Sequence, residues 1–471
     1  MASGTRPRII GAGVTELVAA YCSRRLDPVE VAQTTMAAAE RAGRLYQAVS
    51  VLNARDALAA AQASSQRYRD GTPLGLLDGV PVSVKDSINI AGLQRWHGSR
   101  AYDHLPTAVI DGAPVKRLRE AGAVLFAKTT MPDFGQMGSG LSSQFGIIRN
   151  PWAPALSPGG SSSGAAVLLA CGVGPLAVGT DMGGSVRLPG SQCGVVGFKP
   201  TQGRVAYDPP KLIGVAGPMA RSVADAQALL GVIGAYDAAD PLSLPGRYAA
   251  GEPLSSPAGM HIGLWSRVGY GPAVEPEVMR ALDDQAEVLR RAGATITAIQ
   301  EAPFSPADLA AMCLYYDIKA AFELHSLPAQ RQGLVLESFR LEIERAGRHD
   351  AMTYLRAEAA SNAAAARLRA IIAPYDYVLS PVLPVVGFPA EVVGPGGGGR
   401  LDHLGFTAWF NLTTQPAICL PVTLSPTTGT PIGIQIAGRR FDDAGVLSLA
   451  GWLESRRDFE IPYPFLEQGA T

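Results

Sequence analysis

Cysteine and histidine are scarce in this 471-residue sequence, and neither forms a recognisable cluster. The five cysteines lie far apart and include no C-x-x-C pair, which excludes a zinc or disulfide framework and is typical of reduced, mostly buried thiols in a cytoplasmic protein. The six histidines are dispersed too, without an H-E-x-x-H or similar spacing. We therefore expect no metal at the functional site.

Runs of basic residues and long apolar runs are also missing. Lysine plus arginine total 40 against 41 acidic residues, so the net charge of −1 predicts neither a nucleic-acid partner nor an anionic membrane partner. The longest apolar run, Ala165 to Gly179, is broken by glycines and Pro175 and is too short to span a bilayer. Residues 1–8 lack the apolar core of a signal peptide, which favours a cytoplasmic location.

What the chain does have is the alternation of an α/β protein with a large core, since 47% of its residues are hydrophobic and 17% are charged. Asp27-Pro28-Val29-Glu30 predicts a helix start, with the helix running toward Ala42. A segment rich in proline, glycine, serine and alanine, residues 237–259, predicts a long surface connection, and Gly394 to Gly399 predicts a glycine-rich loop. Short buried strands are predicted at Val80–Val84, Ala123–Phe126, Leu176–Val178, His261–Trp265 and Tyr377–Leu379.

Two serines in glycine-rich segments and one lysine are the candidate nucleophile and base of a catalytic site. Gly159-Gly160-Ser161-Ser162-Ser163-Gly164 lies shortly before Gly179-Thr180-Asp181-Met182-Gly183-Gly184-Ser185, and Lys85 follows an apolar stretch. Serine is a poor nucleophile until a neighbour accepts its proton, and a desolvated, uncharged lysine can do so. Consecutive glycines let backbone N–H groups converge on one point, as an oxyanion requires.

At these residues the chain resembles the amidase signature family of serine hydrolases. The resemblance covers Gly79 to Arg204 strongly and extends more weakly into the C-terminal part. The matching segments are Gly79-Val80-Pro81-Val82-Ser83-Val84-Lys85-Asp86, Gly159-Gly160-Ser161-Ser162, Gly179-Thr180-Asp181-x-Gly183-Gly184-Ser185-x-Arg187, Cys193-Gly194-Val195-Val196-Gly197-Phe198-Lys199-Pro200-Thr201-x-Gly203-Arg204, Phe406-Thr407-x-x-Phe410-Asn411-x-x-x-Gln415-Pro416-Ala417 and Pro431-Ile432-Gly433-Ile434-Gln435.

The resemblance implies a role for each matching residue. Ser185 would be the acylated nucleophile, Ser161 the bridging serine, which in the family follows a cis peptide, and Lys85 the terminal base. The oxyanion-hole N–H groups would come from Met182, Gly183 and Gly184. Such a relay needs no cofactor.

The resemblance also implies a fold, namely one large mixed β-sheet wrapped by α-helices, so we expect residues 1–471 to form a single domain. Asp181 and Arg187, opposite in charge and close to the nucleophile, are expected to support its loop by pairing. The family usually has glycine at the position of Ser163, and threonine or isoleucine at that of Met182. Neither side chain reacts in the family, so we expect an altered pocket and a retained mechanism.

The motifs allow other interpretations. A single Gly-Gly-Ser is most often a turn, an isolated lysine is most often a surface charge, and Ser162 or Ser163 could serve only as a helix N-cap. Gly160-Ser161-Ser162-Ser163-Gly164 also satisfies the G-x-S-x-G elbow of α/β-hydrolase esterases, with Ser162 as nucleophile. An elbow must follow a strand, however, and the prolines of Asn150–Pro158 disfavour one there. No P-loop motif occurs.

Within the family, the function expected is hydrolysis of small amides, hydrophobic or aryl in character, with carbamates and esters as further substrates. The alternative is the amidase subunit of a glutamine-dependent tRNA amidotransferase, which shares the catalytic motifs. The bulk of Trp409 and Phe410 favours a free-standing amidase, acting as a monomer or homodimer. Together with Tyr315 and Tyr316 these aromatics are candidates to line an apolar substrate pocket. A non-catalytic binding protein would have lost Lys85, Ser161 or Ser185.

Overall fold

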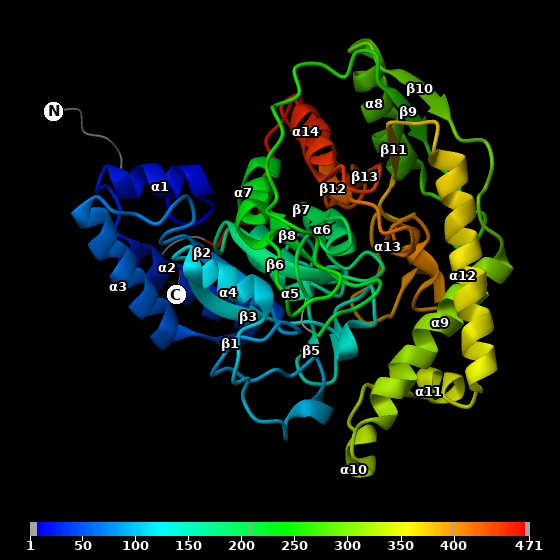
Figure 1. The fold of residues 1–471 in the computed structure, drawn as a ribbon, viewed down its shortest axis with the longest axis horizontal. Helices are drawn as coiled ribbons and strands as arrows, with labels where there is room; N and C mark the ends of the chain where they lie inside the picture. Colours follow the sequence, from blue (N-terminus) through cyan, green and yellow to red (C-terminus); the bar gives the residue numbers. More distant parts are fainter. Residues whose placement is uncertain (1–6, 208, 398, 467–471) are drawn as a thin grey trace.

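The computed structural model describes residues 7–207, 209–397 and 399–466. Within them an 11-stranded mixed sheet runs through the molecule, with helices on both faces (Figure 1). The strand order is β1-β3-β2-β6-β8-β7-β12-β13-β11-β9-β10, and β4 and β5 form a separate two-stranded sheet. The predicted α/β class, with one large mixed sheet wrapped by helices, is confirmed. Residues 1–6, which belong to the N-terminal segment 1–8 without signal-peptide character, lie outside the described residues. Residue 398 of the predicted glycine-rich loop also lies outside them.

The strands are β1 (Val49–Leu52), β2 (Pro81–Lys85), β3 (Val124–Thr129), β4 (Leu141–Ser142), β5 (Gly146–Ile147), β6 (Leu176–Asp181), β7 (Val196–Lys199), β8 (Val215–Ala220), β9 (His261–Leu264), β10 (Thr295–Ala298), β11 (Tyr377–Pro381), β12 (Ala417–Leu424) and β13 (Pro431–Gly438).

The helices are α1 (Val14–Cys22), α2 (Pro28–Tyr46), α3 (Ala54–Asp70), α4 (Ala113–Glu120), α5 (Ser163–Ala170), α6 (Arg187–Cys193), α7 (Val223–Ile233), α8 (Pro276–Arg291), α9 (Pro306–His325), α10 (Ala329–Gln332), α11 (Glu337–Ala346), α12 (Ala351–Ile372), α13 (Ala408–Leu412) and α14 (Asp443–Glu454). Short 3-10 turns occur at Arg100–Tyr102, Asp133–Gly135, Pro395–Gly397 and Asp402–Leu404.

The five predicted strands all exist, as β2, β3, β6, β9 and β11, with ends that shift by a few residues. The predicted helix begins at Pro28, where the Asp27 side chain accepts a hydrogen bond from the Val29 N–H, and it ends at Tyr46 rather than near Ala42. The apolar run Ala165 to Gly179 contains most of α5 and the start of β6. Residues 237–259 connect α7 to β9 without a helix or strand of their own.

The central strands bring the motifs to one edge of the sheet. β2 and β6 are parallel neighbours, with Val82 opposite Leu176 and Val84 opposite Val178. The carboxyl ends of adjacent parallel strands lie at the same edge, so Lys85 at the end of β2 lies beside the end of β6 at Asp181. Side chains alternate along a strand. Val82 and Val84 pack into the core on one face, and Lys85 points to the other.

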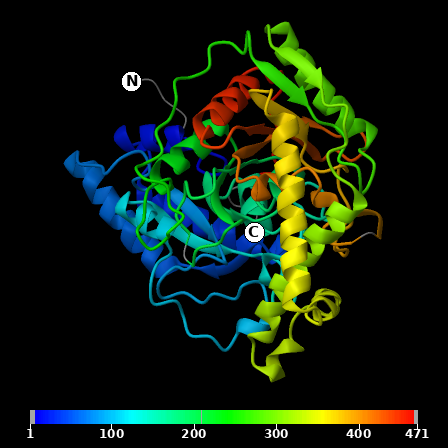
Figure 2. The same cartoon turned by 45° about the vertical axis from the view of Figure 1, so that its right-hand side comes forward.

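Two groups of helices lie at opposite sides of the sheet. Helices α1, α2 and α3 lie at the β1 side, whereas α9 and α12 lie at the other, as Figures 1 and 2 show. Helices α5 and α6 are buried along their whole length. Because α5 begins beside Ser161 and α6 begins just after Ser185, both serines are held at the ends of buried elements.

Candidate active site

Lys85 is a completely buried lysine whose side-chain nitrogen is close to two hydroxyl groups. Nζ is hydrogen bonded to Ser161 Oγ at 2.8 Å and to Thr180 Oγ1 at 2.9 Å. Burial lowers the pKa of Lys85 to about 7, because removal from water disfavours the charged form and the negative charges of Asp181 and Asp86 offset this only in part. Lys85 can therefore be neutral near pH 7 and accept a proton.

Ser161 and Ser162 have different surroundings although they are neighbours. The Gly160–Ser161 peptide is cis, as the resemblance implied, and Ser161 lines a small cavity of about 30 Å³ together with Ser185. Ser162 is fully buried, and its Oγ donates to the Thr180 carbonyl at 3.2 Å. It stands at the N-cap of α5 without a side-chain capping hydrogen bond. The geometry favours Ser161 and Ser185 as reacting groups over Ser162.

Ser185 stands between two small cavities of about 30 Å³ each. One contains Ser161 and His97, and the other is walled by Met312, Tyr316 and neighbouring apolar side chains. Met182 lines both, and it also lines a third cavity of about 920 Å³ that lies farther out. The methionine that departs from the usual family residue therefore stands where the three spaces meet.

The backbone N–H groups around Ser185 differ in whether they already have an acceptor. The Gly184 N–H donates to Asp181 Oδ1 at 2.8 Å, so this predicted oxyanion-hole donor already has an acceptor. Among the described hydrogen bonds, none uses the N–H groups of Met182, Gly183 or Ser185, which leaves these three for an oxyanion. The N–H of Ser185 itself was not predicted, because the sequence offers no sign of which amides a loop leaves unpaired.

Gly184 shows why a glycine occupies the turn. Its φ of +129° is a conformation that L side chains rarely adopt, and an added Cβ would lie 2.4 Å from Thr407 Oγ1. Thr407 approaches so closely because its hydroxyl donates to the Gly183 carbonyl at 2.7 Å. The Tyr316 hydroxyl likewise donates to the Met182 carbonyl at 2.5 Å. These bonds hold both carbonyls in place and so fix the orientation of the loop.

Asp181 and Arg187 form a buried pair beneath the loop, as predicted. Arg187 Nη2 and Nε donate to the two Asp181 oxygens at 2.9 and 3.0 Å. Burial opposes ionisation of Asp181, but the charge and hydrogen bonds of Arg187 outweigh it and hold the Asp181 pKa well below its usual range. Arg187 also donates to the side chains of Asn411 and Gln435, both at 2.7 Å. The C-terminal motif segments thus contribute by holding this pair.

A second buried polar group, which sequence reasoning missed, lies beside Ser161. His97 lines the same small cavity, and its Nδ1 is 3.0 Å from Glu323 Oε1. The Tyr102 hydroxyl donates to the same oxygen at 2.7 Å. Burial lowers the pKa of His97; burial also opposes the ionisation of Glu323, but His97 and Tyr102 outweigh it and bring the Glu323 pKa to about 2. Isolated in the sequence and 226 positions apart, His97 and Glu323 had no motif to reveal them.

Of the four aromatic candidates for the substrate pocket, only Tyr316 lines a described cavity. Trp409 is fully buried and stacks on Phe304, with 3.9 Å between ring centroids, while its Nε1 donates to the Tyr270 hydroxyl. Phe410 is also fully buried. Tyr315 stacks on Tyr354 in the core. Helix α13 carries Trp409 and Phe410 inward, whereas Ala408, the first residue of the same helix, lines the pocket.

Clustered metal ligands or a membrane-spanning helix would indicate other kinds of site. Over residues 7–207, 209–397 and 399–466, no three histidine, cysteine, aspartate or glutamate side chains gather where they could hold a metal ion. In the same ranges, no helix has both the length and the apolar character that crossing a membrane requires.

Comparison with known proteins shows which families, sequences and structures this chain is similar to. The family model described as Amidase matches residues 30–447. The putative amidase AmiB2 of Mycobacterium tuberculosis is 33% identical over 435 residues, 88% of each chain. A glutamyl-tRNA(Gln) amidotransferase subunit of Nitratidesulfovibrio vulgaris is also 33% identical, over 80% of this chain and 83% of that one. The structure of a bacterial aryl acylamidase aligns with a TM-score of 0.87 at 25% identity, covering 95% of this chain and 96% of that one.

Proposed function

This chain belongs to the amidase family, the amidase signature enzymes, and is an amidohydrolase; we propose that it hydrolyses the C–N bond of small hydrophobic or aryl amides through an acyl-enzyme on Ser185. The observation that carries the proposal is the 2.8 Å hydrogen bond between Lys85 Nζ and Ser161 Oγ, in a cavity that Ser185 shares. A buried lysine with a pKa of about 7 can act as a base near neutral pH, and Ser161 connects it to the cavity.

In the proposed reaction, neutral Lys85 accepts the proton of Ser161, which accepts that of Ser185 as Ser185 Oγ attacks the amide carbonyl. The tetrahedral oxyanion is held by the free N–H groups of Met182, Gly183 and Ser185. Ser161 then gives its proton to the leaving nitrogen, the C–N bond breaks and the acyl-enzyme forms. Water, deprotonated along the same path, releases the carboxylic acid and restores Ser185.

The walls around Ser185 support an apolar substrate. Met312, Tyr316, Leu404 and Ala408 line one small cavity, and the larger cavity beyond is also mainly apolar. Free glutamine would bring a charged ammonium into these spaces, where an unpaired charge is costly to desolvate. Aryl carbamates and aryl esters carry the same acyl geometry and are proposed as further substrates.

The test is hydrolysis by the purified chain of a hydrophobic anilide, with Ser185→Ala and Ser162→Ala as a matched pair. We expect Ser185→Ala to abolish turnover while its circular dichroism and melting temperature stay close to those of the wild type. A sulfonyl fluoride should label Ser185 by forming a sulfonate ester at its Oγ, with fluoride as the leaving group. Labelling of Ser162, together with an inactive Ser162→Ala of normal fold, would replace this proposal with the esterase mechanism.

The second candidate function is that of an amidotransferase component, which the relative of 33% identity from Nitratidesulfovibrio vulgaris favours. Its distinguishing result would be hydrolysis of glutamine, and of no anilide, that requires added partner subunits and tRNA. We propose instead that the chain acts as a monomer or homodimer. A cytoplasmic location is supported by the five free cysteines, three of which are buried.

A further inference from the structure

The cavity of about 920 Å³ adjoins the two small cavities at Ser185. Met182 and Gln136 belong both to its wall and to that of the smaller cavity on the Met312 side, and Met182 and Lys211 to that on the Ser161 side. Its remaining wall comes from α9 and from residues within the segments 102–105, 210–213, 326–328 and 349–354. Most of that wall is apolar, with Leu105, Leu212, Ile213, Ile318, Phe322 and Leu327 among its residues.

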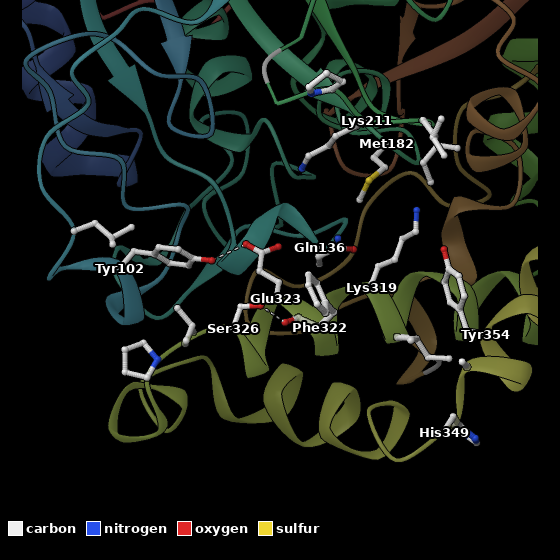
Figure 3. Close-up of a pocket in the computed structure, with 18 of the residues that line it drawn as sticks. Tyr102, Gln136, Met182, Lys211, Lys319, Phe322, Glu323, Ser326, His349 and Tyr354 are labelled. Carbon is white, nitrogen blue, oxygen red and sulfur yellow. Dashed lines mark hydrogen bonds between the residues drawn. The ribbon is translucent and has the colours of Figure 1, made fainter. Parts of the chain in front are cut away.

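Two lysines interrupt this apolar wall. In the view of Figure 3, Lys211 and Lys319 lie on either side of Met182. Met182 also lines both small cavities at Ser185. The ammonium of Lys319 is 4.4 Å from the ring centroid of Tyr315, and that of Lys211 is 5.9 Å from the ring centroid of Tyr207. Within the described part of the chain, neither ammonium has a carboxylate oxygen within 4.0 Å or a hydrogen-bond acceptor.

The acidic side chains of the same wall are already engaged. Glu323 accepts the Tyr102 hydroxyl and lies against His97, as Figure 3 shows for Tyr102. Asp350 caps α12, where it accepts from the Thr353 N–H and hydroxyl. These two carboxylates therefore have local partners, and neither forms an ion pair with Lys211 or Lys319.

The surroundings of Lys319 make its charge costly. Burial lowers the pKa of Lys319, the negative charge of Glu358 opposes this, and the positive charge of Lys211 adds to it. Two cations that repel each other across an apolar cavity are both stabilised by an anion placed between them. His104 and His349 also line the cavity and supply no negative charge.

We propose that this cavity receives an anionic end of the substrate, so that the preferred substrates are amides whose hydrocarbon or aryl body carries a carboxylate that binds Lys211 and Lys319. The inference rests on the proposed function in that the scissile carbonyl lies at Ser185. It adds a charge requirement that the amidase mechanism does not contain. The apolar wall of the large cavity around the lysines then contacts the body of the substrate.

Two matched pairs of probes test the charge requirement from either side of the scissile bond. On the acyl side, adipic acid mono-4-nitroanilide is compared with hexanoic acid 4-nitroanilide. On the amine side, 4-butyramidobenzoate is compared with N-butyryl-4-toluidine. In one of the pairs we expect kcat/KM for the anionic member to exceed that of its neutral partner about tenfold or more, since a charged hydrogen bond commonly contributes that much.

The lysines are tested through the ratio of kcat/KM for the anionic and the neutral probe, measured at about pH 8.5, where Lys85 is largely neutral. Lys211→Met/Lys319→Met should lower this ratio at least tenfold, and Lys211→Arg/Lys319→Arg should retain most of it. Lys116→Met, which removes a lysine on α4 outside the cavity, should leave the ratio unchanged. Equal rates for both members of both pairs, or a ratio that survives in the double methionine variant, would overturn the proposal.

Binding separates this inference from the proposed function. Calorimetric titration of Ser185→Ala with each probe needs no turnover, so it is informative even if the wild type hydrolyses none of them. Tighter binding of an anionic probe that disappears in Ser185→Ala/Lys211→Met/Lys319→Met supports the anionic site. Hydrolysis of neutral anilides with no lysine-dependent binding of anionic ones supports the amidase function and refutes the anionic site.

Discussion

The pH dependence of amide hydrolysis should follow the protonation of Lys85. This lysine is completely buried beside Ser161, and its pKa falls from 10.5 to about 7. The dominant cause is loss of hydration, and the change corresponds to about 5 kcal/mol of extra cost for the charged form. Only the neutral amine can accept the proton of Ser161, so activity should rise with pH and not fall through the neutral range.

The expected magnitude follows from a single titration. With a pKa of about 7, the neutral fraction of Lys85 rises from about one tenth at pH 6 to about nine tenths at pH 8, so kcat/KM should increase about tenfold and then level off. An ordinary lysine would instead leave less than about 1% neutral at pH 8, and the rate would continue to climb past pH 10. The position of the plateau therefore distinguishes a buried base from an exposed one.

The assay is kcat/KM for an uncharged anilide between about pH 5.5 and 10, with kcat measured in parallel. His97 is the necessary control because it lines the same cavity as Ser161 and Ser185. Burial places the pKa of His97 below the ordinary value of 6.5. If His97 were the base, kcat/KM would therefore rise at a lower pH than it does with Lys85 as the base. In His97→Gln, the rise of kcat/KM should stay centred near pH 7 even if kcat/KM itself is lower than in the wild type. Lys85 would be refuted as the base if kcat/KM no longer rose near pH 7 in His97→Gln, or if kcat/KM of the wild type still rose above about pH 9.5.

Three further predictions concern the loop, the core and stability. Gly184→Ala should lower kcat about 100-fold or more, because a Cβ there meets Thr407 and displaces the nucleophile loop; kcat within about threefold of the wild type would contradict this. Trp409→Ala should lower the free energy of unfolding in urea by about 3–5 kcal/mol and change KM little, since Trp409 packs in the core; a larger effect on KM than on stability would place it in the pocket. Because Lys85 and Lys199 have folded pKa values of about 7, the unfolded chain binds more protons at intermediate pH, and the free energy of unfolding should increase from about pH 7 to 10; a Lys199→Met variant with an equally steep increase would exclude the contribution of Lys199.

The sequence predicted the parts of the fold that local pattern determines. The run before Lys85, apart from Ser83, and the run at Leu176 are apolar, as strands buried on both faces require, and both proved to be central strands. Strand β8 was not predicted, because its residues Val215–Ala220 include a glycine and a proline that weaken a strand pattern. It nevertheless pairs with β6 along its full length, where tertiary context outweighs local preference.

The aromatic residues of the C-terminal part show where composition misleads. Trp409 and Phe410 are large and apolar, and the same properties suit a substrate pocket and a protein core. Their helix α13 spans five residues, and its rotation decides which side chain meets the pocket. That rotation places Ala408 in the pocket wall and the two aromatics in the core. No sequence pattern of five residues specifies such an orientation against the rest of the molecule.

Whether a pair of charged residues could be predicted from the sequence depends on whether both residues lie in the same motif. Asp181 and Arg187 are six positions apart, so their pairing beneath the nucleophile loop could be predicted. Lys211 and Lys319 come from distant segments that meet only at the wall of the large cavity. Family motifs record what the reaction needs, and residues between the motifs are free to differ. The substrate preference proposed for this amidase should therefore depend on positions such as these two lysines, which lie outside the motifs that contain Lys85, Ser161 and Ser185.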